Sequence, residues 1–323
     1  MVDSFGRVHR DLRISITDRC NFRCTYCMPA EGMTWLPRSE VLAFEELTRI
    51  ARICVDRFGI DSIRLTGGEP TVRAHLPVLV AQLAALGVDL ALTTNGATLR
   101  ASVADLAAAG LRRVNVSLDS LRPERFAALT RRDALPAVLD GIDAAVEAGL
   151  GPVKVNVVLV RGVNDDEVVD LARFGRDKGV TIRFIEFMPL DADRRWDRSA
   201  VVPAEEIVAA IDAAFPVEPV TRASEPAERW RYVDGAGEVG VIPSVTRPFC
   251  ASCDRIRLTA EGRLRSCLFA TDETDLRSLL RSGASDDAVA AAVARTVAGK
   301  WAGHGIGSAT FVAPPRSMSQ IGG

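Results

Sequence analysis

The sequence predicts an α/β protein: an open, curved (β/α)6 partial barrel of six parallel strands, followed by a smaller C-terminal α+β domain. Over the first 215 residues, short apolar or alternating runs take turns with amphipathic stretches of helical length. This alternation is typical of a parallel sheet with right-handed crossovers. Six such units are too few to close an eightfold barrel. Prolines interrupt the pattern after Phe215, so we expect one domain over 1–215 and another over 216–323.

The first domain begins after a polar arm, residues 1–11, which we expect to be mobile. Leu12–Thr17 alternates apolar and polar residues and predicts the first strand. A helix is expected from Ser39 to about Phe58, with Cys54 on its apolar stripe as a buried structural thiol. The remaining strands are expected at 62–65, 89–93, 113–118, 153–160 and 181–187, and the remaining helices at 75–86, 102–109, 123–130, 135–148, 166–178 and 203–214.

The second domain has a different pattern, which predicts two hairpins and two helices. The hairpins pair residues 230–233 with 238–242 and residues 255–259 with 263–266 across glycine-containing turns. The helices are expected at about 276–281 and 286–301. The tail from Pro314 is too rich in Pro, Ser and Gly to pack by itself.

The composition limits the class of protein. The 323 residues carry a net charge of −2 and are 48% hydrophobic, which is ordinary for a soluble globular chain and gives no overall positive field for nucleic acid. The sequence shows neither a signal peptide nor an apolar run of membrane-spanning length. Six of the seven cysteines lie in two clusters, which favours metal ligands in a reducing cytoplasm over disulfides.

The first cluster lies in the stretch from Asp18 to Pro29, where Cys20, Cys24 and Cys27 occupy eight positions. Three thiolates do not fill a tetrahedral zinc site or a fully protein-bound iron–sulfur cube, each of which needs four ligands. We therefore expect a [4Fe–4S] cluster with one iron open to another ligand. A zinc knuckle that takes its fourth ligand from elsewhere is the alternative.

The second cluster of cysteines also offers three thiols rather than four: Cys250, Cys253 and Cys267. His304, one of three histidines, could complete a zinc site here. The other interpretation is a second iron–sulfur cluster with an open iron.

Several motifs together carry a resemblance to a known family. The CxxxCxxC spacing, with Tyr26 before the third cysteine, resembles the signature of radical S-adenosylmethionine (SAM) enzymes. TGGEP at 66–70 resembles the segment that holds the SAM amino group in those enzymes. With LTTNG, NVSLD, VKVNVV, EFMP, the CxxCDRIRL segment and a terminal Gly-Gly, the chain from about Arg10 onward closely resembles the GTP 3′,8-cyclases of molybdenum cofactor biosynthesis.

The resemblance implies a role for particular residues. The two cysteine trios would hold two [4Fe–4S] clusters, the first binding SAM and the second binding the guanine of GTP. The SAM site would include Tyr26, Gly68, Ser117 and Met188. The GTP contacts would be Arg13, Arg64, Thr93, Lys154, Arg255, Ile256 and Arg257. Arg13, Arg255, Arg257 and the terminal Gly322 and Gly323 would act in turnover, with the tail inserted toward the active site.

The positions of the cations agree with this assignment on physical grounds. Arg13, Arg64 and Lys154 fall on predicted parallel strands, where side chains can point into one lumen. A triphosphate carries about four negative charges, which guanidinium groups bind in bidentate fashion. Arg255 and Arg257 alternate along one strand, so both can face the same ligand. Taken singly, each of these cations would more often lie on the surface or in a salt bridge.

The implied reaction is a radical cyclisation of GTP to 3′,8-cyclo-7,8-dihydroguanosine 5′-triphosphate. A 5′-deoxyadenosyl radical derived from SAM takes the ribose 3′ hydrogen, the carbon radical attacks C8, and a one-electron reduction follows. The resemblance implies a flavodoxin- or ferredoxin-type reductant and cyclic pyranopterin monophosphate synthase as acceptor of the product. No nucleic acid or membrane partner is expected, and the protein would be a monomer or homodimer. A peptide-modifying radical SAM enzyme and a zinc-stabilised binding protein are the alternatives.

Overall fold

Six parallel strands, one from each predicted unit, lie side by side in chain order in the computed structural model, which describes residues 1–191, 194–221, 225–309 and 311–322. Their apolar residues alternate with residues that face the inside of the curve, as in Leu12 and Ile14 of β1, both fully buried. The strands are β1 (Asp11–Ser15), β2 (Ser62–Thr66), β3 (Asp89–Thr94), β4 (Arg113–Ser117), β5 (Lys154–Leu159) and β6 (Thr181–Glu186).

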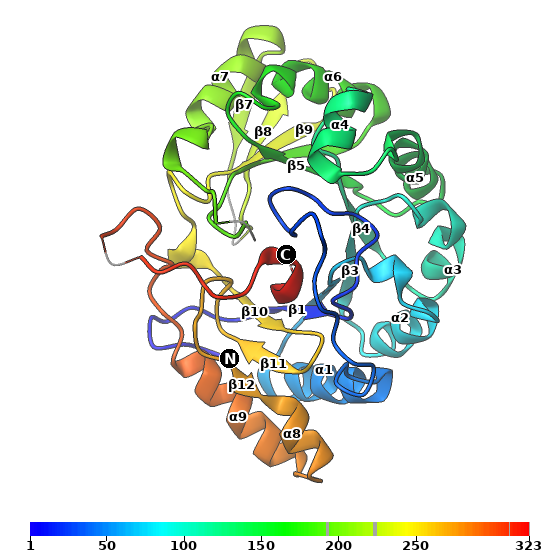
Figure 1. The fold of residues 1–323 in the computed structure, drawn as a ribbon, viewed down its shortest axis with the longest axis vertical. Helices are drawn as coiled ribbons and strands as arrows, with labels where there is room; N and C mark the ends of the chain where they lie inside the picture. Colours follow the sequence, from blue (N-terminus) through cyan, green and yellow to red (C-terminus); the bar gives the residue numbers. More distant parts are fainter. Residues whose placement is uncertain (192–193, 222–224, 310, 323) are drawn as a thin grey trace.

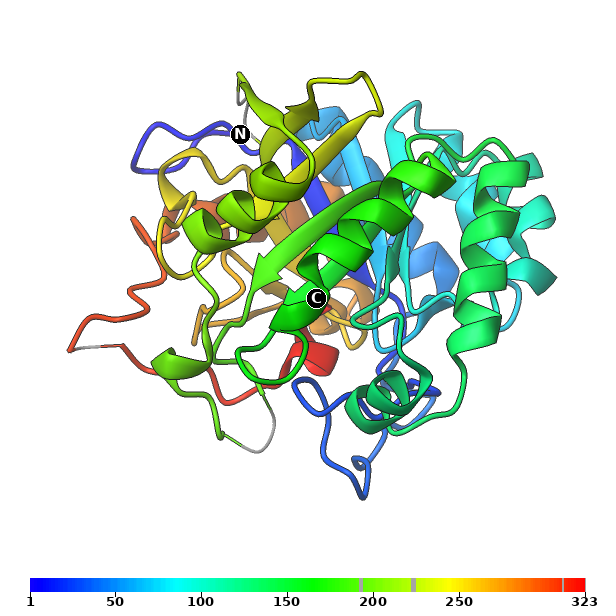
Figure 2. The ribbon, with the colours of Figure 1, turned by 90° about the horizontal axis from the view of Figure 1, so that it is seen from above.

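Helices cover the outer side of this curved sheet (Figure 1). Figure 2 shows the same arrangement from above. The predicted helices are confirmed to within a few residues at their ends: α1 (Phe44–Phe58), α2 (Leu76–Ala84), α3 (Val103–Ala108), α4 (Pro123–Thr130), α5 (Leu135–Glu147), α6 (Val168–Lys178) and α7 (Ala204–Ala214).

The start of α1 differs from the prediction by about four residues. The helix begins at Phe44, and the Glu46 carboxylate accepts a hydrogen bond from the Ala43 N–H at 2.7 Å. The carbonyls of Ser39 and Glu40, where we expected the helix to start, instead accept hydrogen bonds from Arg281 and Arg277. Side chains distant in sequence therefore hold this stretch outside the helix. Cys54 is fully buried, as predicted.

The sheet is wider than the six strands we predicted, because C-terminal strands extend both of its edges. β9 (Glu238–Ile242) pairs in parallel with β6, and β10 (Arg255–Leu258) pairs in parallel with β1. The outer strands are antiparallel: β7 (Val217–Val220), β8 (Glu228–Tyr232), β11 (Arg263–Arg265) and β12 (Thr274–Asp275). Each predicted hairpin is present and pairs the open N–H and C=O groups of one edge. A boundary at residue 216 stays a prediction, since strands on both sides of it belong to one sheet.

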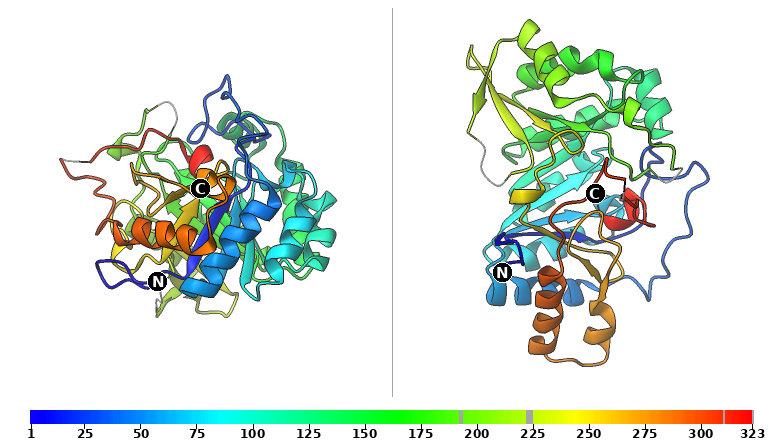
Figure 3. Two further views of the ribbon diagram at one scale, coloured as in Figure 1. Left: turned by 90° about the horizontal axis from the view of Figure 1, so that it is seen from below. Right: turned by 90° about the vertical axis from the view of Figure 1, so that its left-hand side faces the viewer.

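Two helices of the C-terminal part, α8 (Leu276–Arg281) and α9 (Asp286–Ala298), lie beside α1 (Figure 3). Arg49 and Arg57 of α1 form ion pairs with Asp286 and Asp287 at the start of α9, at 2.7 and 2.8 Å. None of the helices in the described residues has the length and apolar character needed to cross a bilayer.

The N-terminal arm is not the mobile segment that we predicted. Val2 and Val8 form an antiparallel bridge, and His9 is fully buried. Asp3 is also buried and accepts hydrogen bonds from the Arg7 guanidinium at 2.6 Å and the Arg7 backbone at 3.0 Å. Internal polar pairing, which composition does not reveal, orders the arm.

The tail also folds, but only against the rest of the chain. It ends in the single-turn helix α10 (Met318–Ile321), which lies inside the curve of the sheet (Figure 1). Ile321 is 1% exposed and packs with Leu190 and Phe269. This agrees with the expectation that the tail cannot pack by itself.

Candidate active site

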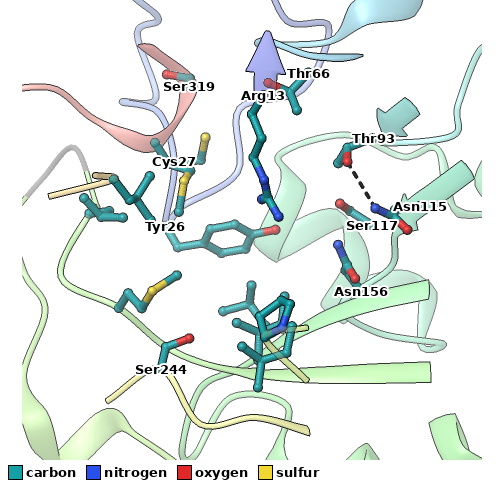
Figure 4. Close-up of a pocket in the computed structure, with 18 of the residues that line it drawn as sticks. Arg13, Tyr26, Cys27, Thr66, Thr93, Asn115, Ser117, Asn156, Ser244 and Ser319 are labelled. Atoms are coloured by element: carbon teal, nitrogen blue, oxygen red, sulfur yellow. Dashed lines mark hydrogen bonds between the residues drawn. The ribbon is translucent and has the colours of Figure 1, made fainter. Parts of the chain in front are cut away.

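A cavity of about 290 Å³ opens on the concave side of the sheet, and the cysteines of both trios line it. Side chains from β1 and from β3–β5 converge on it, as Figure 4 shows for Arg13, Thr93, Asn115, Ser117 and Asn156. The carboxyl-end loops of a parallel sheet are the usual place for ligands in α/β folds. Two segments more than 220 residues apart in sequence, residues 20–27 and 250–267, therefore contribute to one site.

The two glycines of the TGGEP segment hold the loop that carries the first trio. The Gly68 N–H donates to the Thr17 carbonyl at 2.8 Å, and a Cβ at Gly68 would lie 2.4 Å from the Arg19 carbonyl oxygen. A Cβ at Gly67, whose φ is +155°, would lie 2.5 Å from the Thr17 carbonyl oxygen. Glycine is therefore required here for close backbone packing, in addition to any ligand contact.

Glu69 of the same segment is 1% exposed and fastens the loop after β2 to the loop after β3. Its carboxylate accepts from the Thr94 hydroxyl at 2.7 Å and the Asn95 N–H at 2.6 Å. Burial raises the pKa of Glu69, and these hydrogen bonds oppose that shift. The Asn95 side chain then donates to Asn21, one residue from Cys20, at 2.7 Å.

Tyr26, within the first trio, is oriented by a buried carboxylate. Its hydroxyl donates to Asp119 Oδ2 at 2.5 Å, and Asp119 Oδ1 accepts the Val158 N–H at 2.8 Å. Burial raises the pKa of Asp119 to about 6, against the effect of these two hydrogen bonds. Sequence reasoning missed Asp119, although it ends the NVSLD segment directly after a predicted strand.

The thiols of the first trio lie in surroundings that disfavour the thiolate. Burial raises the pKa of Cys20 to about 11 and that of Cys27 to about 12, and it raises the pKa of Cys24 well above its usual value. The charges of Asp119 and of the neighbouring cysteines raise the pKa of Cys24 further. Buried thiolates this close together need a cationic centre to stabilise them, which an iron–sulfur cluster supplies.

Three cations extend the site from β10 across β1 to β2. Arg13 lies between Arg257 and Arg64 in the strand register, and all three line the cavity. Burial, together with the other arginines, lowers the pKa of Arg13 well below its usual value and lowers that of Arg257 to about 10. Positive charge is therefore gathered here without enough anions to balance it.

Two buried donors of this group lack a partner among the described residues. The Nε atoms of Arg13 and Arg64 have no hydrogen-bond acceptor, and Asp11 lies 3.7 Å from Arg13 Nε. Unpaired buried donors and excess positive charge are costly unless an anion binds. The donor set therefore fits a polyphosphate.

On the opposite wall, Arg183 of β6 adds a cation that sequence reasoning missed. It donates to the Asn156 side chain at 2.6 Å and lines the cavity. Burial and the charge of Arg64 lower its pKa to about 9. The signal that could have found it is a cation inside the apolar stretch TIRFIE, a pattern that Arg13 and Arg64 share on their own strands. Asn115 and Asn156 also line the cavity and were missed.

The surroundings of the second trio are more positive. The Arg255 guanidinium lies 3.5 Å and the Lys300 ammonium 3.6 Å from the Cys253 sulfur. Burial raises the pKa of Cys253, but these two cations outweigh burial and lower the pKa to about 6. A thiolate is thus favoured at Cys253 even before any metal binds.

The histidine that could have completed a zinc site has other partners. His304 Nε2 lies 3.0 Å from the Ser244 carbonyl, and its Nδ1 accepts the Ile306 N–H at 3.1 Å. Within the described residues, no three Cys, His, Asp or Glu side chains converge closely enough to hold a single metal ion. Each trio nevertheless lies close enough for its thiols to influence one another's pKa. Both ring nitrogens of His304 are therefore engaged within the protein.

The tail reaches both trios. Ser319 of α10 hydrogen bonds to Cys27, and Ile321 belongs to the apolar cluster against which Cys267 packs. Arg257 donates to the Gly322 carbonyl at 2.5 Å. Gly322 has φ +74°, and a Cβ there would lie 2.5 Å from Thr66 Oγ1. This position therefore requires glycine. Gly323 lies outside the described residues.

Most residues that the sequence singled out lie around this cavity, with three exceptions. Ile256 is fully buried in the core on the other face of β10, so only its backbone could meet a ligand. Lys154 does not line the cavity, although burial and the charges of Arg183 and Arg64 lower its pKa to about 8. Gly322 lies beside the cavity through its contact with Arg257. The cavity lining includes the others: Arg13, Tyr26, Arg64, Gly68, Thr93, Ser117, Met188, Arg255, Arg257 and the six clustered cysteines.

Comparison with known proteins gives matches along almost the whole chain. Residues 14–175 match the Radical SAM superfamily, and residues 180–306 match the family Molybdenum Cofactor Synthesis C. The chain is 51% identical to a GTP 3′,8-cyclase of Streptomyces coelicolor, over 100% of this chain and 96% of that protein. It is 50% identical to a GTP 3′,8-cyclase of Corynebacterium glutamicum, over 100% of this chain and 89% of that protein.

Solved structures share the fold at low sequence identity. Streptococcus suis SuiB, solved with bound S-adenosylmethionine, has a TM-score of 0.62 and 13% identity, over 85% of this chain and 66% of that one. Methylornithine synthase has a TM-score of 0.52 and 18% identity, over 65% of this chain and 63% of that one. These likenesses support the radical SAM α/β fold with its mainly parallel sheet.

Proposed function

The chain belongs to the GTP 3′,8-cyclase family of radical SAM enzymes, and from this membership we infer its reaction. It converts GTP to 3′,8-cyclo-7,8-dihydroguanosine 5′-triphosphate in molybdenum cofactor biosynthesis, using SAM and two [4Fe–4S] clusters. One observation carries the inference on the structural side: both cysteine trios line a single cavity that also gathers unpaired guanidinium groups.

The first trio and its surroundings would hold SAM. Cys20, Cys24 and Cys27 would bind three irons of a cluster, leaving the fourth for SAM. When bound, this cluster and SAM supply the 5′-deoxyadenosyl radical that removes the ribose 3′ hydrogen of GTP so that C3′ can bond to C8. We propose that Tyr26, Gly68, Ser117 and Met188 line the SAM site. The hydrogen bond that the Tyr26 hydroxyl donates to Asp119 orients the Tyr26 ring before the ligand binds.

The second trio and the cations would hold GTP. We propose that Cys250, Cys253 and Cys267 bind the cluster whose open iron meets guanine, and that the triphosphate lies along Arg257, Arg13 and Arg64. Arg257 is buried, Arg13 and Arg64 are half-buried, and β-sheet register already arranges all three, so little ordering is needed when the anion binds. Thr93, Lys154, Arg255 and the backbone of Ile256 would complete the contacts, and Arg183 would join them.

We propose that the tail takes part in turnover. Gly322 is held by Arg257, a proposed GTP contact, while Ser319 contacts Cys27. Because Met318 and Ser319 line the cavity, the tail helps to exclude water from it. We propose the same role for Gly323, the next residue in the sequence.

Partners and location are proposals of the same kind. We propose a flavodoxin- or ferredoxin-type reductant, cyclic pyranopterin monophosphate synthase as the acceptor of the product, a monomeric or homodimeric state, and a reducing cytoplasm, which would keep the clustered thiols available as ligands.

Anaerobic turnover tests this function directly. Reconstituted protein with SAM, GTP and a reductant should form 5′-deoxyadenosine together with the cyclised nucleotide, and ATP in place of GTP serves as the control. The same background level of 5′-deoxyadenosine with both nucleotides would contradict the assignment and favour another radical SAM substrate, such as a peptide.

A further inference from the structure

Lys300 is a buried ammonium group that the proposed reaction does not use. It is 3% exposed and follows α9, distant in sequence from every proposed ligand contact. Among the described residues, no carboxylate lies within ion-pair distance of its Nζ atom. A buried cation without an anion is unfavourable, so its position requires an explanation.

The contacts of Lys300 all lead to the second trio or to the N-terminal arm. Its Nζ donates to the Arg255 carbonyl at 2.7 Å and the Cys253 carbonyl at 3.3 Å, and it lies 3.6 Å from the Cys253 sulfur. His9 Nδ1 lies 3.5 Å away on the other side. The anion nearest to this ammonium is therefore the sulfur of a proposed cluster ligand.

The arm contacts this group through His9 and binds the neighbouring backbone through Arg7. Asp3 binds His9 Nε2 at 3.0 Å and Arg7 at 2.6 Å, so its charge is shared with Arg7. The Arg7 guanidinium then donates to the carbonyls of Cys250, at 2.8 Å, and Trp301, at 2.6 Å. The arm thus ties both sides of Lys300 to the loop that carries the second trio.

The hydrogen bonds to the sulfurs of the first trio come from uncharged donors, and the nearby Arg23 guanidinium donates to the Cys20 carbonyl at 2.7 Å. The Cys20 sulfur accepts the Phe22 N–H at 3.3 Å, and Cys27 is bonded by Ser319. Reduction adds one negative charge to an iron–sulfur cluster, and hydrogen bonds and charge near its sulfurs set its potential. A fixed ammonium beside Cys253 stabilises the reduced form of the second cluster more than the oxidised form.

We propose that Lys300, held by the N-terminal arm, is a positioning residue that raises the reduction potential of the second cluster relative to the first. The proposal rests on the proposed function, because it takes Cys253 as a cluster ligand. The two clusters then differ in reduction potential, and an added electron is more stable on the second cluster than on the first.

A redox titration followed by EPR tests the proposal on the reconstituted holoenzyme, without GTP. A protein with Cys20, Cys24 and Cys27 changed to Ala assigns the signal of the second cluster. In Lys300→Met, which is close in volume to the native residue, we expect the reduction equilibrium of the second cluster to fall about tenfold, which is about 59 mV for one electron. The potential of the first cluster should stay unchanged.

Two further variants separate charge from structure. Lys300→Arg keeps the charge and should restore most of the potential. Lys178→Met removes an exposed lysine that pairs with Asp143, and it should leave both clusters as they are. An unshifted second cluster in Lys300→Met, or an equal shift of both clusters, would overturn the proposal.

The proposal can also be tested if Lys300→Met does not assemble its second cluster. Lys300→Gln, which keeps N–H donors for the two carbonyls, would then be titrated, and its second-cluster potential should also fall. An unshifted potential in Lys300→Gln, or failure of this variant too to hold the cluster, would overturn the proposal in favour of a purely structural lysine. Failure to act on GTP would contradict the proposed function but leave this potential measurable.

Discussion

The two cysteine trios lie in different electrostatic surroundings although they line the same cavity, and the difference is clearest at Cys253. Around the first, burial and the charge of Asp119 raise the thiol pKa values. At the second, Arg255 and Lys300 outweigh burial and lower the pKa of Cys253. The same ligand type at similar spacing therefore meets two environments, one poor and one rich in positive charge. This difference matches the proposed division of labour, in which the first cluster splits SAM and the second holds a highly anionic substrate.

The largest expected effect comes from removing one cysteine of either trio. Cys24→Ala should abolish formation of 5′-deoxyadenosine, because a cluster without its third ligand cannot present SAM. Cys253→Ala should instead lose GTP-dependent product. Chromatography of 5′-deoxyadenosine and iron analysis would measure both effects, and each variant should lose about half of its iron. If Cys24→Ala still cleaves SAM, the assignment of SAM cleavage to the first trio is wrong.

The cations proposed to bind the triphosphate of GTP are tested by Arg257→Ala. The loss of a buried cation that faces phosphate should weaken GTP binding by roughly 2–5 kcal/mol, or about thirtyfold or more in Kd, and should leave SAM binding nearly unchanged. Equilibrium binding of each ligand to anaerobic protein measures this, with the exposed Arg173→Ala as control. Equal losses for both ligands would argue against a separate triphosphate region.

The buried carboxylate of Asp119, beside the first trio, is tested by the pH dependence of the protein's stability. Burial raises the pKa of Asp119 to about 6 from its ordinary 3.8, so the folded state binds more protons than the unfolded state between these values. Stability should then fall by about 2 kcal/mol as pH rises from 4 to 6. Urea unfolding of the apoprotein would measure this contribution. Asp119→Asn should remove it, whereas the exposed Asp133→Asn should keep it.

The smallest expected effect concerns the tail that joins the two trios. Gly322→Ala introduces a Cβ beside Thr66 Oγ1 and Ser15 at a positive φ, and should weaken docking of the tail by about 1–3 kcal/mol. Faster hydrogen exchange over residues 314–322 would show the loss. Gly299→Ala, with φ −82° and no Cβ neighbour closer than 3.7 Å, is the matched control and should exchange like the parent protein.

The sequence predicted the parts of this molecule that depend on local pattern. The alternation of strands and helices located β1–β6 and α1–α7, and the family resemblance, with which their place on apolar strands agreed, singled out Arg13 and Arg64. The sequence did not predict contacts between residues that lie far apart in the chain. Pairing of β9 and β10 with the edges of the first six strands, the burial of Asp3 and His9, and the packing of α10 depend on partners far along the chain. Lys300 carries no local motif, and Asp119 ends the NVSLD segment, but only the fold reveals the contacts of either residue.

The central claim is that each trio holds a cluster with one iron open to the shared cavity. A Mössbauer spectrum of anaerobically reconstituted, ⁵⁷Fe-labelled protein tests it most directly. We expect about eight irons per chain in two [4Fe–4S] clusters, with one iron of the first cluster changed by SAM alone and one iron of the second changed by GTP alone. Zinc at either trio, or a single cluster that responds to both ligands, would contradict the account.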